Sequence, residues 1–91
     1  MNRKRDRLAV IRDILKIIAE NHNSVKPTPL LRESNLSSAR FAEYYSELLA
    51  KGLVKEIVDE RGRNYVTLTD KGFSYLEKYS QIINFINEFG L

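Results

Sequence analysis

The chain lacks several residue types that hold small folds together or carry chemistry. None of its 91 residues is cysteine, which excludes disulfides and thiolate metal sites. The single histidine, His22, has no second histidine or cysteine to share a metal with, so we expect an exposed turn residue and neither metal nor cofactor. Apolar runs are only a few residues long, and no signal-peptide core is visible. We therefore expect a soluble cytoplasmic protein without membrane contact.

The motifs of common enzymes are also missing. The sequence has no glycine-rich phosphate loop, no nucleophile with a plausible histidine partner, and no paired carboxylates at a recognisable spacing. Internal repeats and low-complexity tracts are absent as well. We expect one small non-enzymatic domain with a modest core.

Positive charge is concentrated at the front of a chain whose net charge is +3. Residues 1–32 carry eight Lys/Arg against three Asp/Glu, whereas residues 33–91 carry seven against nine. Arg3, Lys4 and Arg5 lie in a predicted basic arm at residues 2–7. This asymmetry indicates a polyanionic partner at one end. The alternative is a basic tail that only keeps the protein soluble.

Caps and turn residues divide the chain into four helices and one hairpin, an α+β class that is mainly α. Helices are expected at residues 7–20, from a Thr28 N-cap to about residue 34, at 37–51 and at 70–88, with strands at 53–58 and 65–68. Asp6, Ser37 and Thr69 are the candidate N-caps of the other three helices. Gly52 and Asn35 stand where a left-handed backbone is needed. Gly72, in the first turn of the last helix, predicts a neighbour that approaches closely.

Two helices carry more apolar surface than one face requires. Helix 7–20 has one stripe at residues 8, 11, 15 and 18 and a second at 10, 14 and 17. Packing inside the domain or against a partner subunit would explain the second stripe, and the partner is the more economical explanation in so short a chain. Helix 70–88 is apolar on most of its circumference past Ser80. The predicted dimer interface consists of Val10, Ile14, Ile17, Leu76, Tyr79, Ile82, Ile83, Phe85, Ile86 and Phe89.

The helix at residues 37–51 has an inward apolar face and an outward face of mostly small residues. Small outward residues permit a close approach to a DNA groove, and Ser38 and Arg40 can donate to phosphates or base edges. The alternative is an ordinary solvated face, which Glu43 and Glu47 favour.

The hairpin tip at residues 59–64 places Arg61 and Arg63 on either side of Gly62. These arginines would reach a DNA backbone or minor groove, unless Asp59 and Glu60 neutralise the tip into a plain surface turn. In the strands, Val54, Ile57 and Val58 are expected to face Tyr65, Val66 and Leu68.

Three motifs resemble those of archaeal winged-helix DNA-binding proteins, a family of small basic chromatin-type proteins and regulators that dimerise through a C-terminal helix. The motifs are Asn35-Leu36-Ser37, Leu48-Leu49-x-Lys51-Gly52-Leu53-Val54 and Tyr65-x-x-Leu68-Thr69-x-Lys71-Gly72. The resemblance implies a winged helix-turn-helix that binds duplex DNA as a symmetric dimer, with helix 37–51 in the major groove and the hairpin on the flanking backbone. Because the chain stops at Leu91, we expect a compact dimer and not a long coiled-coil rod.

The sequence thus predicts a homodimeric transcriptional regulator or nucleoid-associated DNA-binding protein. Residues 1–69 would form the DNA-binding core and residues 70–91 the dimerisation helix. The predicted DNA contacts are Arg3, Lys4, Arg5, Lys26, Thr28, Ser37, Ser38, Ala39, Arg40, Glu43, Arg61 and Arg63. A protein-interaction module without DNA binding is the alternative, although the basic arm has no obvious role there. Binding of single-stranded DNA or RNA ranks last. It needs exposed aromatic residues for base stacking, whereas the aromatic residues here are mostly predicted at core or dimer positions.

Overall fold

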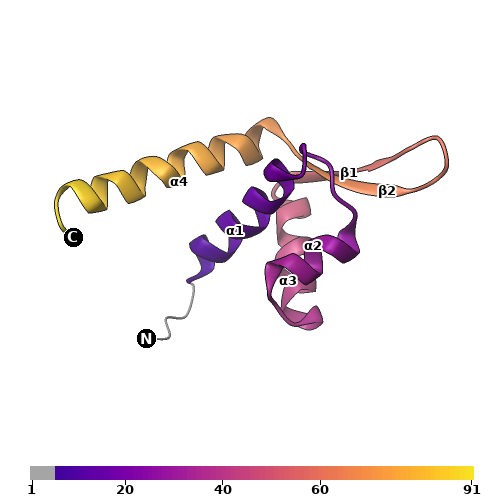
Figure 1. Cartoon of the computed structure of the whole chain (residues 1–91), viewed down its shortest axis with the longest axis horizontal. Coiled ribbons are helices and arrows are strands. Elements are labelled where there is room, and N and C mark those ends of the chain that lie inside the picture. The colour runs from indigo at the N-terminus through magenta and orange to yellow at the C-terminus, as the bar shows by residue number, and fades with distance from the viewer. Residues whose placement is uncertain (1–5) are drawn as a thin grey trace.

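The computed structural model describes residues 6–91 as four helices and a two-stranded antiparallel hairpin (Figure 1). The elements are α1 (Arg7–Glu20), α2 (Pro27–Ser34), α3 (Ser38–Ala50), β1 (Val54–Val58), β2 (Asn64–Leu68) and α4 (Asp70–Glu88). Their order confirms the predicted α+β, mainly helical winged arrangement. Within residues 6–91, no helix is both long enough and apolar enough to cross a bilayer.

Three helices begin at side-chain caps that the sequence indicates. Asp6 accepts a hydrogen bond from the Ala9 amide at 2.8 Å, and Ser37 accepts one from the Arg40 amide at 3.2 Å. Each cap satisfies a backbone donor that has no partner inside the helix. Thr69 caps α4 in the same way, through the amide three residues later. These starts are fixed by local chemistry.

The start of α2 was predicted wrongly. The helix begins at Pro27 with Lys26 at its N-cap position, and no side chain caps it, so Thr28 is not the cap. Pro27 has no N–H to satisfy and a backbone angle already suited to a helix, which makes it a good first residue. Asn35 ends the helix in the left-handed conformation, with φ of 61°, as predicted.

The core lies between α1, α2, α3 and the base of the hairpin. Its fully buried large side chains are Val10, Ile14, Leu15, Ile18, Leu30, Leu48 and Val66. Val25, in the link between α1 and α2, exchanges backbone hydrogen bonds of 3.2 and 2.8 Å with Val66. β2 therefore lies between β1 and this short extended segment.

The second stripe of α1 packs inside the domain, which corrects part of the predicted dimer interface. Val10 and Ile14 are 1% and 0% exposed, and Ile17 is half-buried against the same core. Because α1 contacts α2, β2 and α4, it is covered on more than one side by its own chain. Val10 and Ile14 therefore have no surface left for a partner subunit.

Only the base of the hairpin packs on the body of the protein. Val54 pairs with Leu68 at the buried end of the register, and both side chains are buried. Toward the tip, Ile57 pairs with Tyr65 as predicted, whereas Val58 pairs with Asn64, and the two side chains are 44% and 61% exposed. The tip projects beyond the core (Figure 1), which agrees with the exposure of these side chains.

The first turn of α4 contacts the residues that follow α3. A Cβ atom on Gly72 would lie 2.3 Å from the Leu53 carbonyl oxygen, which confirms the close approach that this glycine predicts. The Thr69 hydroxyl donates to the Gly52 carbonyl at 2.5 Å. The start of α4 therefore packs directly on the segment that links α3 to β1.

Candidate nucleic-acid interface

The exposed face of α3 begins at its N-terminus. Ser37, Ser38, Ala39, Arg40 and Glu43, all predicted to contact DNA, are exposed in the structure. Short side chains over the first turn leave the helix backbone accessible to a ligand surface. The geometry is suited to insertion into a groove about as wide as a helix.

The edge of α3 that faces α1 carries paired charges. Glu47 forms ion pairs with Arg7, from the start of α1, and with Lys51, at 3.7 Å. Arg40 lies over the Tyr44 ring, with its guanidinium carbon 5.9 Å from the ring centroid. This cation–π contact holds the Arg40 side chain at the rim of the exposed face.

A hydrogen bond joins α3 to the wing, the hairpin formed by β1, β2 and the tip between them. The Tyr45 hydroxyl donates to a Glu56 carboxylate oxygen at 2.6 Å. Burial raises the pKa of Tyr45 far above its ordinary value, and the bond to Glu56 raises it further. The hydroxyl therefore stays protonated, and it links the two elements that would approach DNA.

Asp59 organises the tip of the wing. One of its carboxylate oxygens accepts hydrogen bonds from the Arg61 and Arg63 amides, each at 2.9 Å. Its second oxygen accepts from the Arg63 Nε at 2.7 Å. These bonds, the Arg63 amide first, lower the pKa of Asp59 below its ordinary value. Gly62 takes a positive φ of 80° between the arginines, as a tight tip requires.

The two wing arginines are therefore not equivalent. Arg63 is held by Asp59, whereas the side chain of Arg61 is exposed and forms no ion pair with any residue between 6 and 91. The sequence shows both beside acidic residues and gives no means of separating them. The turn conformation decides which of them Asp59 holds.

The structure describes only two of the remaining predicted DNA contacts. Lys26 and Thr28 are exposed at the start of α2. Arg3, Lys4 and Arg5 lie outside the described residues. Among residues 6–91, no cluster of three His, Cys, Asp or Glu side chains could hold a metal ion.

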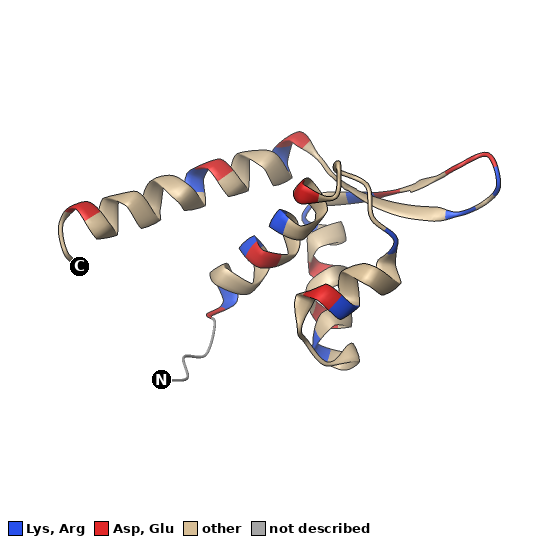
Figure 2. Cartoon of the chain, viewed as in Figure 1, with Lys and Arg blue, Asp and Glu red and all other residues tan. Residues whose placement is uncertain are grey.

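The second half of α4 carries an exposed apolar surface. Ile82, Phe85 and Phe89 are 54%, 55% and 61% exposed, and the Phe85 and Phe89 rings lie 4.9 Å apart. Figure 2 shows this part of α4 almost free of charge, because no charged residue occurs between Lys78 and Glu88. On the neighbouring side of the helix, Leu76, Tyr79 and Ile86 are half-buried and Ile83 lies at the margin of exposure.

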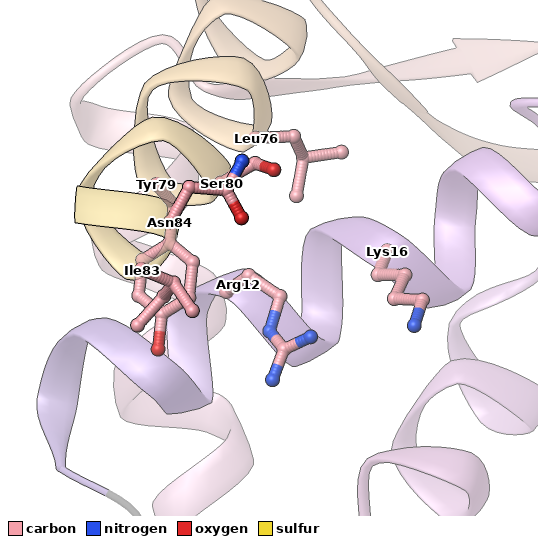
Figure 3. A pocket seen from close by; sticks show the side chains of 7 residues that line it. All are labelled: Arg12, Lys16, Leu76, Tyr79, Ser80, Ile83 and Asn84. Carbon is pink, nitrogen blue, oxygen red and sulfur yellow. The ribbon is translucent and has the colours of Figure 1, made fainter. Parts of the chain in front are cut away.

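A groove of about 420 Å³ separates this half of α4 from α1 (Figure 3). Arg12 and Lys16 line it from α1, opposite Leu76, Tyr79, Ser80, Ile83 and Asn84 of α4. The Arg12 guanidinium carbon lies 5.3 Å from the Tyr79 ring centroid. Arg12 and Lys16 are not among the predicted site residues, although their spacing of four residues places them on one helix face.

Solved structures of similar fold cover most of the chain. The PcaV transcriptional regulator from Streptomyces coelicolor is 20% identical with a TM-score of 0.74, over 89% of this chain and 60% of that chain. Sso10a-2, a DNA-binding protein from Sulfolobus solfataricus, is 15% identical with a TM-score of 0.73, over 93% and 85%. F93 from STIV, a winged-helix DNA-binding protein, is 20% identical with a TM-score of 0.71, over 88% and 91%. At these identities the likeness establishes the fold, and the chain spans only 60% of PcaV.

No curated protein sequence matches the chain. The sequence profile of winged helix-turn-helix proteins, in contrast, matches residues 4–87, nearly its full length. This match agrees with the helix order, the capped α3 and the two-stranded wing, and it confirms the likeness expected from the motifs. The chain therefore belongs to the winged helix-turn-helix family.

Proposed function

We propose that the protein is a homodimeric transcriptional regulator or chromatin-type protein that binds double-stranded DNA in the cytoplasm. The observation that carries the proposal is the exposed, small-residue face of α3, joined through Tyr45 and Glu56 to a wing with a free arginine. Two similar structures are named as DNA-binding proteins and a third as a transcriptional regulator, which supports the same function.

In this proposal α3 enters the major groove and the wing follows the flanking backbone. Arg61 neutralises a phosphate, while the Ser37 and Ser38 hydroxyls, Lys26 and Thr28 fix the position of the helix on the duplex. Arg40 contacts the backbone or a base edge from the rim of α3. Arg3, Lys4 and Arg5 of the basic arm add further phosphate contacts.

The second half of α4 forms the dimer interface. Its apolar side chains are exposed along a segment without charge, and such patches normally mark an interface. The radius of gyration is 14.1 Å, compared with about 12 Å for a compact domain of this length. Figure 1 shows the cause, because α4 and the hairpin both extend past the body, on opposite sides. A twofold dimer predicts a palindromic target with half-sites about one DNA turn apart.

Fluorescence anisotropy on a mixed-sequence duplex, from roughly 50 to 200 mM salt, tests DNA binding directly. We expect affinity to fall steeply with salt, because each neutralised phosphate releases counterions. Absence of binding at the lowest salt would contradict a chromatin-type role. It would favour the alternative, a protein-interaction module, with which the exposed Glu43 on the outer face of α3 is compatible.

The wing offers a matched pair of variants for the same assay. Arg61→Ala should weaken binding and reduce the salt slope by about one per subunit, because it removes a phosphate contact. Arg63→Ala should have a smaller effect, because Asp59 already holds that side chain. Equal effects would show that Asp59 releases Arg63 on DNA. An unchanged slope for both variants would remove the wing from the interface.

A further inference from the structure

Glu43 occupies the centre of the exposed face of α3. Ala39, Glu43, Ser46 and Ala50 follow a 4-3-4 spacing, which forms one stripe along a helix, and all four are exposed. The buried Phe41 lies two residues away, on nearly the opposite side of the helix. Glu43 is the only long side chain in this stripe, so it alone reaches deep into a groove that the stripe enters.

The side chain of Glu43 also has no partner within the described part of the chain. No ion pair or hydrogen bond joins it to any residue between 6 and 91, whereas Glu47, one turn later, is paired with Arg7 and Lys51. DNA phosphates repel an unpaired carboxylate, unless a donor group on a base edge forms a hydrogen bond to it. The position of this charge therefore requires either a base contact or a general loss of DNA affinity.

We propose that Glu43 is a sequence-reading residue that selects cytosine in each half-site. In the major groove, cytosine presents the N4 amino donor, whereas guanine presents two acceptors and thymine one acceptor and a methyl group. Adenine has a donor, but its neighbouring N7 acceptor faces the same carboxylate and repels it. The flanking small residues Ala39 and Ser46 let α3 approach closely enough for this contact. The inference rests on the proposed binding of duplex DNA through α3.

In vitro selection from randomised duplexes, with the full chain, tests the proposal. Wild-type protein should enrich sites with an invariant cytosine in each half-site. Glu43→Gln should replace that cytosine by adenine, because an amide donates to N7 and accepts from N6 together. Exchanging the cytosine for adenine should weaken wild-type binding by about 5- to 150-fold and leave Glu43→Gln binding equal or tighter.

Glu47→Gln is the matched control, because it removes the same charge from the same helix. It should raise affinity for all duplexes slightly and keep the selected cytosine. If Glu43→Gln selects the wild-type sequence and binds every duplex more tightly, Glu43 only repels DNA and the inference is overturned. Enrichment of no common site by a wild-type protein that binds DNA would overturn it too. Failure of the wild type to bind any duplex would instead reject the proposed function itself.

Discussion

The two halves of α4 have similar apolar content but different surroundings. In the first half, Gly72 is buried against Leu53, and Tyr75 and Leu76 pack against the core. In the second half, Ile82 and Phe85 are more than half exposed. One continuous helix thus has most of its apolar surface covered by its own chain at one end, where Phe73 is the exception at 44% exposed, and largely uncovered at the other. The sequence pattern of α4 shows which side chains are apolar and should be buried. The fold shows which of them this chain leaves exposed to solvent.

Phe85→Glu should give the largest effect, on assembly and not on folding. A carboxylate at the centre of the exposed surface should weaken a dimer at least about 100-fold, or ~3 kcal/mol, because it would be buried without a partner. Sedimentation velocity over a range of protein concentrations measures the change. Asn84→Glu, the preceding residue on the polar side of the helix, is the control and should leave the dimer intact. A normal dimer of Phe85→Glu would place the interface elsewhere.

Gly72→Ala should act on the first half and destabilise the fold by about 2 kcal/mol. The new Cβ would meet the Leu53 carbonyl oxygen, which belongs to the backbone and has little freedom to move. Urea unfolding at fixed protein concentration measures the loss. Ser74→Ala, two residues later, should be nearly neutral. Since alanine is the better helix former, a stabilised Gly72→Ala would show that α4 shifts freely away from α3.

Tyr75→Phe should have the smallest effect, a loss of about 1 kcal/mol of unfolding free energy. The Tyr75 hydroxyl donates to the Leu8 carbonyl at 2.7 Å and so ties the first half of α4 to α1. Tyr79→Phe is a matched control, because the structure gives the Tyr79 hydroxyl no partner among residues 6–91, although its ring stacks on Tyr75. Equal losses for both variants, again by urea unfolding, would mean that the Leu8 bond adds no stability.

Features that depend on a few neighbouring residues were predicted well from the sequence. The caps at Asp6, Ser37 and Thr69 each involve an amide three residues away, and the structure confirms all three. The bounds of α4 and the left-handed Gly52 follow from equally local chemistry. Only Thr28 failed, since Pro27 competes with it for the start of the same helix.

Features that depend on distant parts of the chain were predicted poorly. The α1 sequence shows two apolar stripes, but only the positions of β2 and α4 reveal that Val10 and Ile14 are covered internally. Likewise, strand periodicity cannot show that the hairpin projects beyond the core and leaves Ile57 exposed. The different states of Arg61 and Arg63 depend on how the tip folds around Asp59.

The start of α4 is tied to the segment that follows α3. The Lys71 ammonium donates to the Lys51 carbonyl at 2.8 Å, beside the contacts of Thr69 with Gly52 and of Gly72 with Leu53, so a tilt of α4 would be transmitted to the C-terminal end of α3. α4 is about 28 Å long, and a tilt of about 5° moves one end by about 2.5 Å relative to the other. In a dimer joined through the second half of α4, substitution of its apolar residues would change the tilt of α4. The distance between the two α3 helices would change with it. Residues that never touch DNA would then decide which half-site spacing the protein accepts.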